Sequence, residues 1–410
     1  MPIKVSHFSK PFDKFWLLNT DTSPLLRPHS PTLPQRRHVY KPNNQVKGNR
    51  PVAIGYDFST VGLSCRQPRY GVSEPAWNPP LSMRLVPYAE NKNSFTAKQV
   101  NDLLNNESLP LGSSLTVNTL DSNYSSPEYI AQTHDQSNLI NIIRFPSNRN
   151  VWKQLTAEQV KQQRENNADN RGANKVYGAK YKLSQVADWN LMADEQSSFG
   201  VKLSNGKTCV VQLSIWEDMM IRSKRGHSMK DKPFRLVRIR LLDGQTGQAL
   251  FKKSMWLGVW GDQRATITGE EIYWSYRNRY DIEHFFRFGK QRLLLDKSQT
   301  PEEENLQNWL EVVNLAYWLL FVGKEQAEHT CPKWQQYDKH YKNRIKHRLK
   351  VTPSQVQLQM MGIILSFDQS SFLPKVQIKG KGRQTGQTQA KRKRYPILEL
   401  KKKKKRRRYR

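Results

Sequence analysis

The chain has 410 residues, of which 37% are hydrophobic, a length that suits two or three domains with ordinary cores. Lys and Arg number 67 against 35 Asp and Glu, and the formal net charge of +32 calls for a polyanionic partner, nucleic acid before an anionic membrane. Three widely spaced cysteines argue against a disulfide framework or zinc knuckle and favour a reducing cytosol, and the N-terminus lacks the apolar segment of a signal peptide.

The charge is spread along the chain. Residues 379–410 carry 16 Lys and Arg against one acid, about half of the net charge, so the remainder is basic too. The most apolar stretch, residues 312–322, is too short to span a bilayer and is interpreted as a buried helix. We therefore expect no membrane partner.

Two predicted strands each lead to an aspartate. The apolar run at residues 15–18 predicts a buried strand with Asp21 at its end. Residues 114–120 alternate polar and apolar side chains, which indicates another strand, and Asp121 follows directly. Between them we expect strands at 51–56 and 81–86 and a short helix at 98–105.

The middle of the chain is rich in predicted strands. Residues 147–173 are polar and are interpreted as a linker or surface helix, and the alternation at 208–215 is imperfect. Residues 234–242 alternate better, with Val237, Ile239 and Leu241 on one face and Arg238 and Arg240 on the other. A turn that begins at Asp243-Gly244 and a returning strand over 250–260 complete a predicted hairpin.

Two capping boxes predict helices. Thr268 with Glu271 would begin a long helix over 269–295, and Thr300 with Glu303 would begin a second. The second helix has an apolar face made of Leu306, Trp309, Leu310, Val313, Tyr317 and Leu320. Residues 331–378 have a mixed pattern, and the basic stretch from Lys379 onward is expected to be disordered until it binds a partner.

The first of these helices carries the most informative motif. Tyr276, Arg279, Glu283 and Lys290 would fall within roughly 60° of arc at about 100° per residue. A solvated face with an Arg–Glu pair at i, i+4 would explain part of this pattern. However, a carboxylate among cations beside an apolar stripe also suits a site for a metal ion and phosphates.

The spacing Tyr-x2-Arg-x3-Glu-x6-Lys at these four positions resembles the YREK signature of bacterial insertion-sequence transposases of the DDE type. The resemblance implies an α/β fold: a ribonuclease H-like mixed sheet flanked by helices and interrupted by a β-rich insertion subdomain. Asp21, Asp121 and Glu283 would be its catalytic, metal-binding carboxylates. The implied division is core at 1–160, insertion at 161–262, helical remainder of the core at 263–378 and basic tail at 379–410.

The implied activity is metal-dependent cleavage of phosphodiester bonds at transposon ends, followed by strand transfer into target DNA. Two Mg²⁺ ions, replaceable by Mn²⁺, would activate the attacking oxygen and stabilise the leaving oxygen. Tyr276, Arg279 and Lys290 would contact DNA phosphates. The implied partners are double-stranded DNA, as transposon end and target, and a second copy in a homodimer, in a bacterial cytoplasm.

Several assignments are less specific. Asp13 and Asp135 are rivals of Asp21 and Asp121, with Asp57 and Asp102 less well placed. Trp256 and Trp260 could stack on a flipped base, although β-sheet packing is the favoured interpretation. Arg238 and Arg240 could follow a DNA backbone, with a solvated strand face as the equal alternative. The basic tail would add affinity without sequence preference.

Two other functions remain open. Family members usually carry a helical DNA-binding region before the first Asp, whereas 20 residues precede Asp21. The alternative is therefore a catalytically inactive, N-terminally truncated transposase relic that only binds DNA. A tyrosine recombinase is less favoured: His284 and Arg287 form an HxxR, but Tyr317 falls in an apolar helix face.

Overall fold

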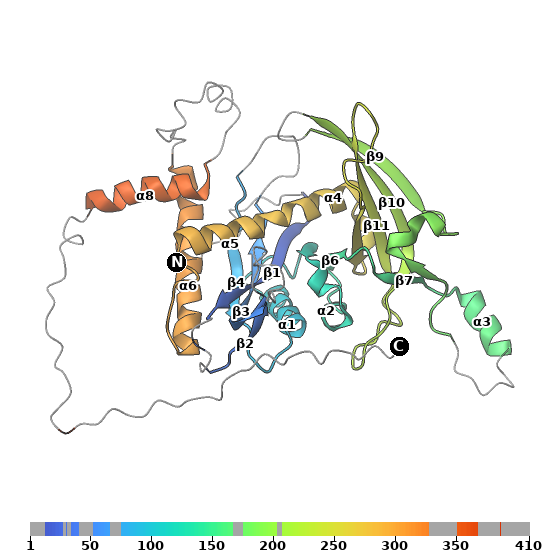
Figure 1. Ribbon diagram of the computed structural model, residues 1–410, viewed down its shortest axis with the longest axis horizontal. Helices are drawn as coiled ribbons and strands as arrows, with labels where there is room; N and C mark the ends of the chain where they lie inside the picture. Colours follow the sequence, from blue (N-terminus) through green and yellow to red (C-terminus); the bar gives the residue numbers. More distant parts are fainter. Residues whose placement is uncertain are drawn as a thin grey trace, which may run out of the picture.

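The computed structural model describes residues 13–27, 30, 34–40, 52–65, 75–166, 175–202, 207–327, 351–367 and 386. These residues form a mixed sheet of 12 strands with helices on both faces (Figure 1). Cys331 and the basic tail at 379–410, apart from Gly386, lie outside the described residues. The mixed sheet flanked by helices is consistent with a ribonuclease H-like domain.

The sheet has a mixed half and an antiparallel half. Its strands are β1 (Trp16–Leu26), β2 (Arg37–Tyr40), β3 (Val52–Leu63), β4 (Pro80–Leu85), β5 (Thr116–Leu120), β6 (Leu139–Phe145), β7 (Asn150–Lys153), β8 (Lys180–Lys182), β9 (Glu195–Lys202), β10 (Thr208–Met220), β11 (Phe234–Asp243) and β12 (Met255–Trp260). They are ordered β2-β3-β1-β5-β6-β12-β11-β10-β7-β8, with β4 paired to β3 and β9 to β10. β1, β5 and β6 run parallel, while β3 is antiparallel to β1.

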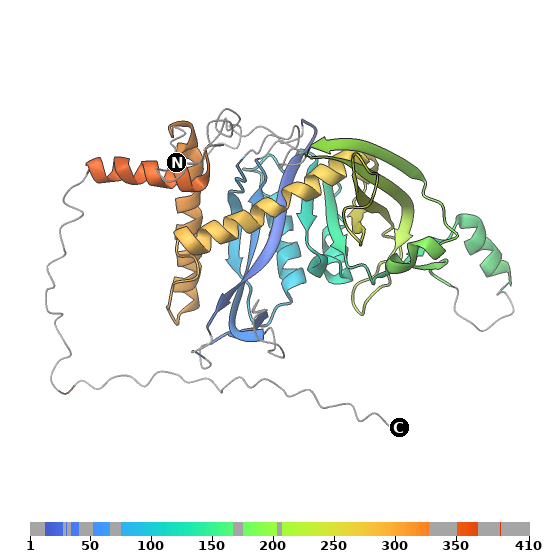
Figure 2. The same ribbon diagram turned by 45° about the horizontal axis from the view of Figure 1, so that its top comes forward.

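Helices cover both faces of the sheet. They are α1 (Lys92–Leu104), α2 (Pro127–Thr133), α3 (Ala157–Asn166), α4 (Gly269–Asn278), α5 (Tyr280–Arg292), α6 (Glu303–Val322) and α8 (Pro353–Phe367). Alternation along β1 separates the two faces, because Leu17 packs with residues of α4 and Leu18 with residues of α1. Figure 2 shows α4 and α5 crossing in front of β1. None of the described helices is long and apolar enough to cross a membrane.

The β-rich half differs from its expected place. The hairpin is confirmed, since β11 and β12 pair antiparallel with Val237 opposite Leu257, although β12 begins at Met255 and not at 250. The prediction that the β-rich residues form a unit outside the core sheet is wrong. β12 pairs antiparallel with β6, with Leu257 opposite Arg144. The outer edge of β6 exposes backbone groups that need partners, and pairing with β12 supplies them.

The predicted helix over 269–295 is divided in two. The capping box is confirmed: the Thr268 hydroxyl accepts from the Glu271 amide at 3.2 Å, and the Glu271 carboxylate accepts from the Thr268 amide at 2.8 Å. The helix then breaks at Arg279, between α4 and α5. The Ile282 amide donates to the Arg279 carbonyl at 3.2 Å, so the Asn278 carbonyl is left to accept from the Asn19 side chain at 3.1 Å. This contact with β1 explains the break.

The last long helix buries its predicted face but begins later than expected. Five of the six residues on the predicted face of α6 are buried and Trp309 is partly buried, and they pack with α5 and with Trp77. The prediction of a second capping box is wrong, because the helix begins at Glu303. The Thr300 hydroxyl accepts from the amide of Glu302, whereas in a capping box it would accept from the amide of Glu303. The helix at 98–105 is confirmed but begins at Lys92, and the segment at 147–173 contains both β7 and α3.

Candidate active site

Two of the three predicted carboxylates lie side by side at the sheet. Thr20 of β1 pairs with Leu120 of the parallel strand β5, so Asp21 and Asp121 follow at the same level on neighbouring strands. Asp121 comes directly after β5 as expected. Asp21 does not end its strand, because β1 continues to Leu26 by pairing with β3 along its whole second half.

The third carboxylate reaches this site from the helix above it. The guanidinium of Arg279 donates from Nη2 to Oδ2 of Asp21 at 2.9 Å and from Nη1 to Oε1 of Glu283 at 3.1 Å. The i, i+4 pair that periodicity predicts is thus present, but the same arginine also contacts a strand 258 residues earlier. Arg279 is buried at the helix junction, so it connects β1 to α5.

The electrostatics of the site are set by burial and by these charges. Burial raises the pKa of Asp21 to about 6, although Arg279 and the Thr22 amide lower it; the nearby charges of Asp121 and Glu283 add to the increase. Burial alone would lower the pKa of Arg279, yet the negative charge of Asp21, with smaller contributions from Asp121 and Glu283, keeps it above its usual value. The charges of Asp121 and Glu283 therefore act on both Asp21 and Arg279.

The other members of the predicted face already have protein partners. Tyr276 packs in the core beneath α4, and burial raises the pKa of its hydroxyl to about 12. Lys290 of α5 donates to the Ser23 hydroxyl at 2.7 Å and to the Pro24 carbonyl at 3.3 Å. Burial lowers the pKa of Lys290. The helix face that carries the four motif residues thus lies along β1, with Asn19 beside the end of α4 and Ser23 beside Lys290 of α5.

The strand residues singled out for DNA contact lie elsewhere. Val237 and Ile239 pack beneath α4, so Arg238 and Arg240 point to the opposite face of the sheet. Arg238 lies over the Trp256 ring at 5.8 Å and donates to the Ser254 hydroxyl at 2.9 Å. Both tryptophans are buried, Trp256 2% exposed and Trp260 1% exposed, and Trp260 stacks on Phe234. Their burial favours the packing interpretation.

The rival aspartates, Asp13, Asp57, Asp102 and Asp135, make no contact with Asp21, Asp121 or Glu283 among the ion pairs and hydrogen bonds of the described residues. Asp57 is buried and pairs with Lys92 at 2.7 Å, and Asp102 pairs with Arg84 at 3.0 Å. Asp135 is 90% exposed beside Lys232, and Asp13 is exposed before β1. These contacts are those of surface or structural ion pairs.

A comparison with protein families adds independent support for the resemblance. The model of the family described as "Transposase DDE domain" matches residues 78–319, more than half of the chain. The chain belongs to the DDE transposase family. The family implies an enzyme of the polynucleotidyl transferase type and a DNA substrate. No curated protein matches the chain.

The family match covers only part of the candidate site. Asp121, Arg279 and Glu283 of this transposase lie within the matched segment, whereas Asp21 precedes it. The support for Asp21 therefore comes from the sequence pattern and from the structure, through its level beside Asp121 and its ion pair with Arg279.

The ligand chemistry of the site fits a divalent cation. Members of the family generally use divalent metals, and carboxylate oxygens are the ligands that Mg²⁺ prefers. Among the residues that the structure describes, no three His, Cys, Asp or Glu side chains are grouped closely enough to hold one ion. The guanidinium of Arg279 instead bridges Asp21 and Glu283. The raised pKa of Asp21 indicates that this one cation does not offset its burial, so further positive charge would be favourable there.

Sequence patterns missed two groups of residues around the site of this transposase. Asn19 donates to the Asn278 carbonyl, and its own carbonyl oxygen accepts from the Thr119 hydroxyl at 2.7 Å. Arg144 follows Ile143, the partner of Leu120, and so stands at the level of Asp121 on the next strand. The only available signal was a cation within the apolar strand at 139–145, because these neighbours depend on strand register.

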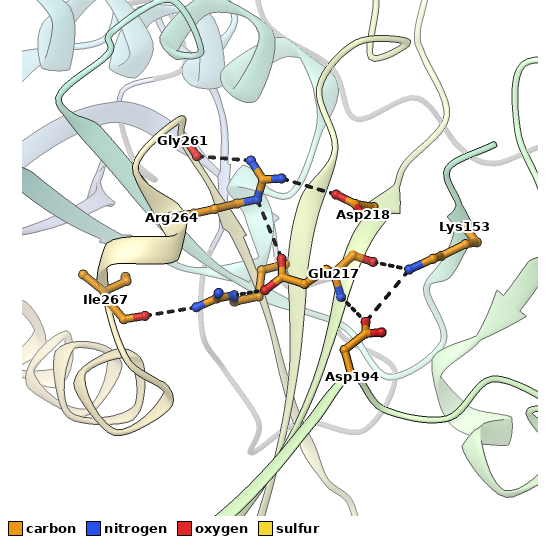
Figure 3. Close-up of polar contacts among 8 residues, drawn as sticks. Lys153, Asp194, Glu217, Asp218, Gly261, Arg264 and Ile267 are labelled. Carbon is orange, nitrogen blue, oxygen red and sulfur yellow. Dashed lines mark hydrogen bonds and ion pairs between the residues drawn. The ribbon is translucent and has the colours of Figure 1, made fainter. Parts of the chain in front are cut away.

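A second polar cluster fixes the beginning of the helix that carries the site (Figure 3). Arg235 of β11 donates to Glu217 at 2.6 Å and to the Ile267 carbonyl at 3.0 Å, next to the Thr268 cap of α4. Glu217 lies in an irregular part of β10, where Asp218 has a φ of +48°. Arg264, from the turn before α4, lies 3.5 Å from the Asp218 carboxylate. These contacts tie the β-rich half to α4.

Proposed function

We propose that this transposase cleaves phosphodiester bonds at transposon ends and joins the freed end to target DNA, with Asp21, Asp121 and Glu283 as its catalytic carboxylates. The observation that carries the proposal is that Asp21 of β1 and Glu283 of α5 share the guanidinium of Arg279, while Asp121 follows β5 at the level of Asp21 on the neighbouring strand. The family membership supports a DNA substrate and a transferase type of reaction.

Asp21, Asp121 and Glu283 would hold two Mg²⁺ ions, or Mn²⁺ in their place. Bound there, the ions would activate the attacking oxygen and stabilise the leaving oxygen of the phosphodiester. Asp21 stands beside Asp121 on the neighbouring strand and shares Arg279 with Glu283, so it would be the ligand common to both ions.

The residues of the YREK signature have a structural and a DNA-binding part in this proposal. Arg279 holds the carboxylates of Asp21 and Glu283 close together before a metal is bound. A DNA phosphate would then compete with them for its guanidinium. Lys290 supports β1 beyond Asp21. Assignment of the chain to the YREK group rests on the spacing of Tyr276, Arg279, Glu283 and Lys290.

Several finer features belong to the same proposal. Residues 161–262 would act as the β-rich insertion, although its strands continue the core sheet. Two copies would act on paired transposon ends as a homodimer. A catalytically inactive relic that only binds DNA is the alternative, and cleavage assays distinguish the two.

The decisive variant is Glu283→Gln, which keeps the shape of the side chain and removes its charge. The substrate is a duplex carrying the inverted repeat that a transposase gene is expected to have in its genomic flank. We expect the variant to bind this duplex with the affinity of the parent protein but to nick it at less than a hundredth of the parent rate in Mg²⁺ or Mn²⁺. Glu107→Gln, an exposed loop residue, is the matched control and should cut normally.

Arg279→Ala is the companion variant. It removes the cation and leaves the carboxylates, so it should lower both affinity for the duplex and the dependence of binding on salt. Undiminished Mg²⁺-dependent nicking by Glu283→Gln would refute the catalytic assignment. A parent protein that binds the duplex and never nicks it would favour the relic.

A further inference from the structure

The groups that the YREK spacing assigns to DNA phosphates are engaged within the protein. The Arg279 guanidinium contacts two carboxylates, and the Lys290 ammonium donates to Ser23 and Pro24. Tyr276 is 8% exposed in the core beneath α4. An incoming phosphate would have to displace one of these contacts, so another cation beside the carboxylates would be the first to meet it.

Arg144 is placed to be that cation. The parallel pairs Thr20–Leu120 and Leu120–Ile143 put Asp21, Asp121 and Arg144 at one level on three adjacent chain segments. Ile140 and Ile142 precede it on the face that packs beneath α4, so alternation directs Arg144 to the same face as the site.

The surroundings of Arg144 leave its charge available. Its side chain is exposed, and none of the ion pairs among the described residues includes it. Its neighbour on the helix side is the Tyr276 hydroxyl, a neutral group that also senses the charges of Asp121 and Arg279. Arg144 thus stands on the Asp121 side of the site, while Arg279 occupies the side between Asp21 and Glu283.

We infer that Arg144 binds a backbone phosphate of the DNA next to the bond that is cut. The inference rests on the proposed function and extends it to a residue outside the YREK spacing. A guanidinium presents a planar fork that matches phosphate oxygens, and a hydrogen bond between two charged groups is stronger than a neutral one. When Arg144 binds a phosphate it gives up no ion pair with the protein, because its neighbour on the helix side is the neutral Tyr276 hydroxyl.

The test compares Arg144→Ala with Arg164→Ala, an exposed arginine of α3 at the far end of the β-rich half (Figure 1). Binding of the inverted-repeat duplex is measured by fluorescence anisotropy over a salt series, with thermal unfolding as a check on folding. Arg144→Ala should bind about tenfold more weakly and lower the slope of log K against log salt by about one. Arg164→Ala should match the parent in both.

Arg144→Lys keeps the positive charge and therefore tests whether the shape of the guanidinium matters for phosphate binding. It should retain the parent slope and lose affinity by only a few fold, because a point charge replaces the fork. Parental affinity and slope in Arg144→Ala, with a parent protein that cuts and a Glu283→Gln variant that does not, would overturn the inference alone. A parent without salt-dependent binding would overturn the proposed function and the inference together.

Discussion

At the scale of residues, Arg279 explains why the spacing between the arginine and Glu283 is informative. A surface pair at i, i+4 contributes little to stability. Here the same guanidinium is buried and also binds Asp21, so the spacing sets a contact between a helix and the first strand of the sheet. The motif therefore joins parts of the chain that lie far apart in sequence.

The charge of Asp21 should cost stability in the metal-free protein. Its pKa is raised from 3.8 to about 6, so the folded protein holds this proton more tightly than the unfolded chain does. The cost is therefore present above pH 6 and is relieved as the pH falls toward 4. In EDTA, the Tm of Asp21→Asn relative to the parent should rise between pH 5 and pH 8.

The matched control for this pH series is Asp102→Asn, which removes the charge of an exposed aspartate. Its Tm difference from the parent should stay nearly constant over the same range. A difference for Asp21→Asn that is also independent of pH would show that the carboxyl titrates normally in the folded protein.

The sequence could predict some residues of the site and not others. Glu283 and Arg279 were found because helical spacing is a local pattern, and Asp121 because its strand alternates clearly. Asn19 and Arg144 were not found, because their importance depends on which strands become neighbours. Register between distant segments leaves no local signal in one sequence.

At the scale of elements, the consecutive helices α4 and α5, the second of which carries Glu283, are held at three points along their length. Arg235 binds the carbonyl before the cap of α4, Asn19 binds the carbonyl at the break between them, and Lys290 binds β1 near the end of α5. Capping and amphipathic spacing predicted where the helix begins but not the break at Arg279. The break follows from a hydrogen bond to β1, a tertiary contact.

The first of these anchors can be tested by Arg235→Ala. The substitution leaves the Ile267 carbonyl and the Glu217 carboxylate without their buried donor, so it should lower the free energy of unfolding by about 2 kcal/mol. Urea denaturation is the measurement. Arg240→Ala, on the same strand but with one long hydrogen bond at 3.4 Å, should cost less than about 0.5 kcal/mol. Equal losses in the two variants would contradict the role of Arg235.

At the scale of the whole molecule, the β-rich half continues the sheet on which Asp21 lies and after whose strand β5 Asp121 follows. Period-two alternation predicted the β11–β12 hairpin, but it carries no information on which edge the hairpin joins. The pairing of β12 with β6 makes the two halves one sheet, and α4 crosses both.

The basic tail should act on affinity alone. Residues 379–410 carry 16 Lys and Arg, and contacts to phosphates hold no base readout. Removal of this segment should weaken binding of the inverted-repeat duplex at low salt and lower the salt slope, while the preference over a scrambled duplex stays unchanged. Equal binding by the truncated and full chains across the salt series would refute this.

The central claim is that Asp21, Asp121 and Glu283 together bind divalent cations, and a count of bound Mn²⁺ tests it most directly. Free Mn²⁺ is measured by electron paramagnetic resonance in titrations of the protein with the inverted-repeat duplex, after subtraction of binding to the duplex alone. The account predicts about two ions per chain for the parent, in line with a two-metal site, and weaker binding with fewer ions for Asp121→Asn. Parental Mn²⁺ binding in Asp121→Asn, or no binding by the parent itself, would contradict it.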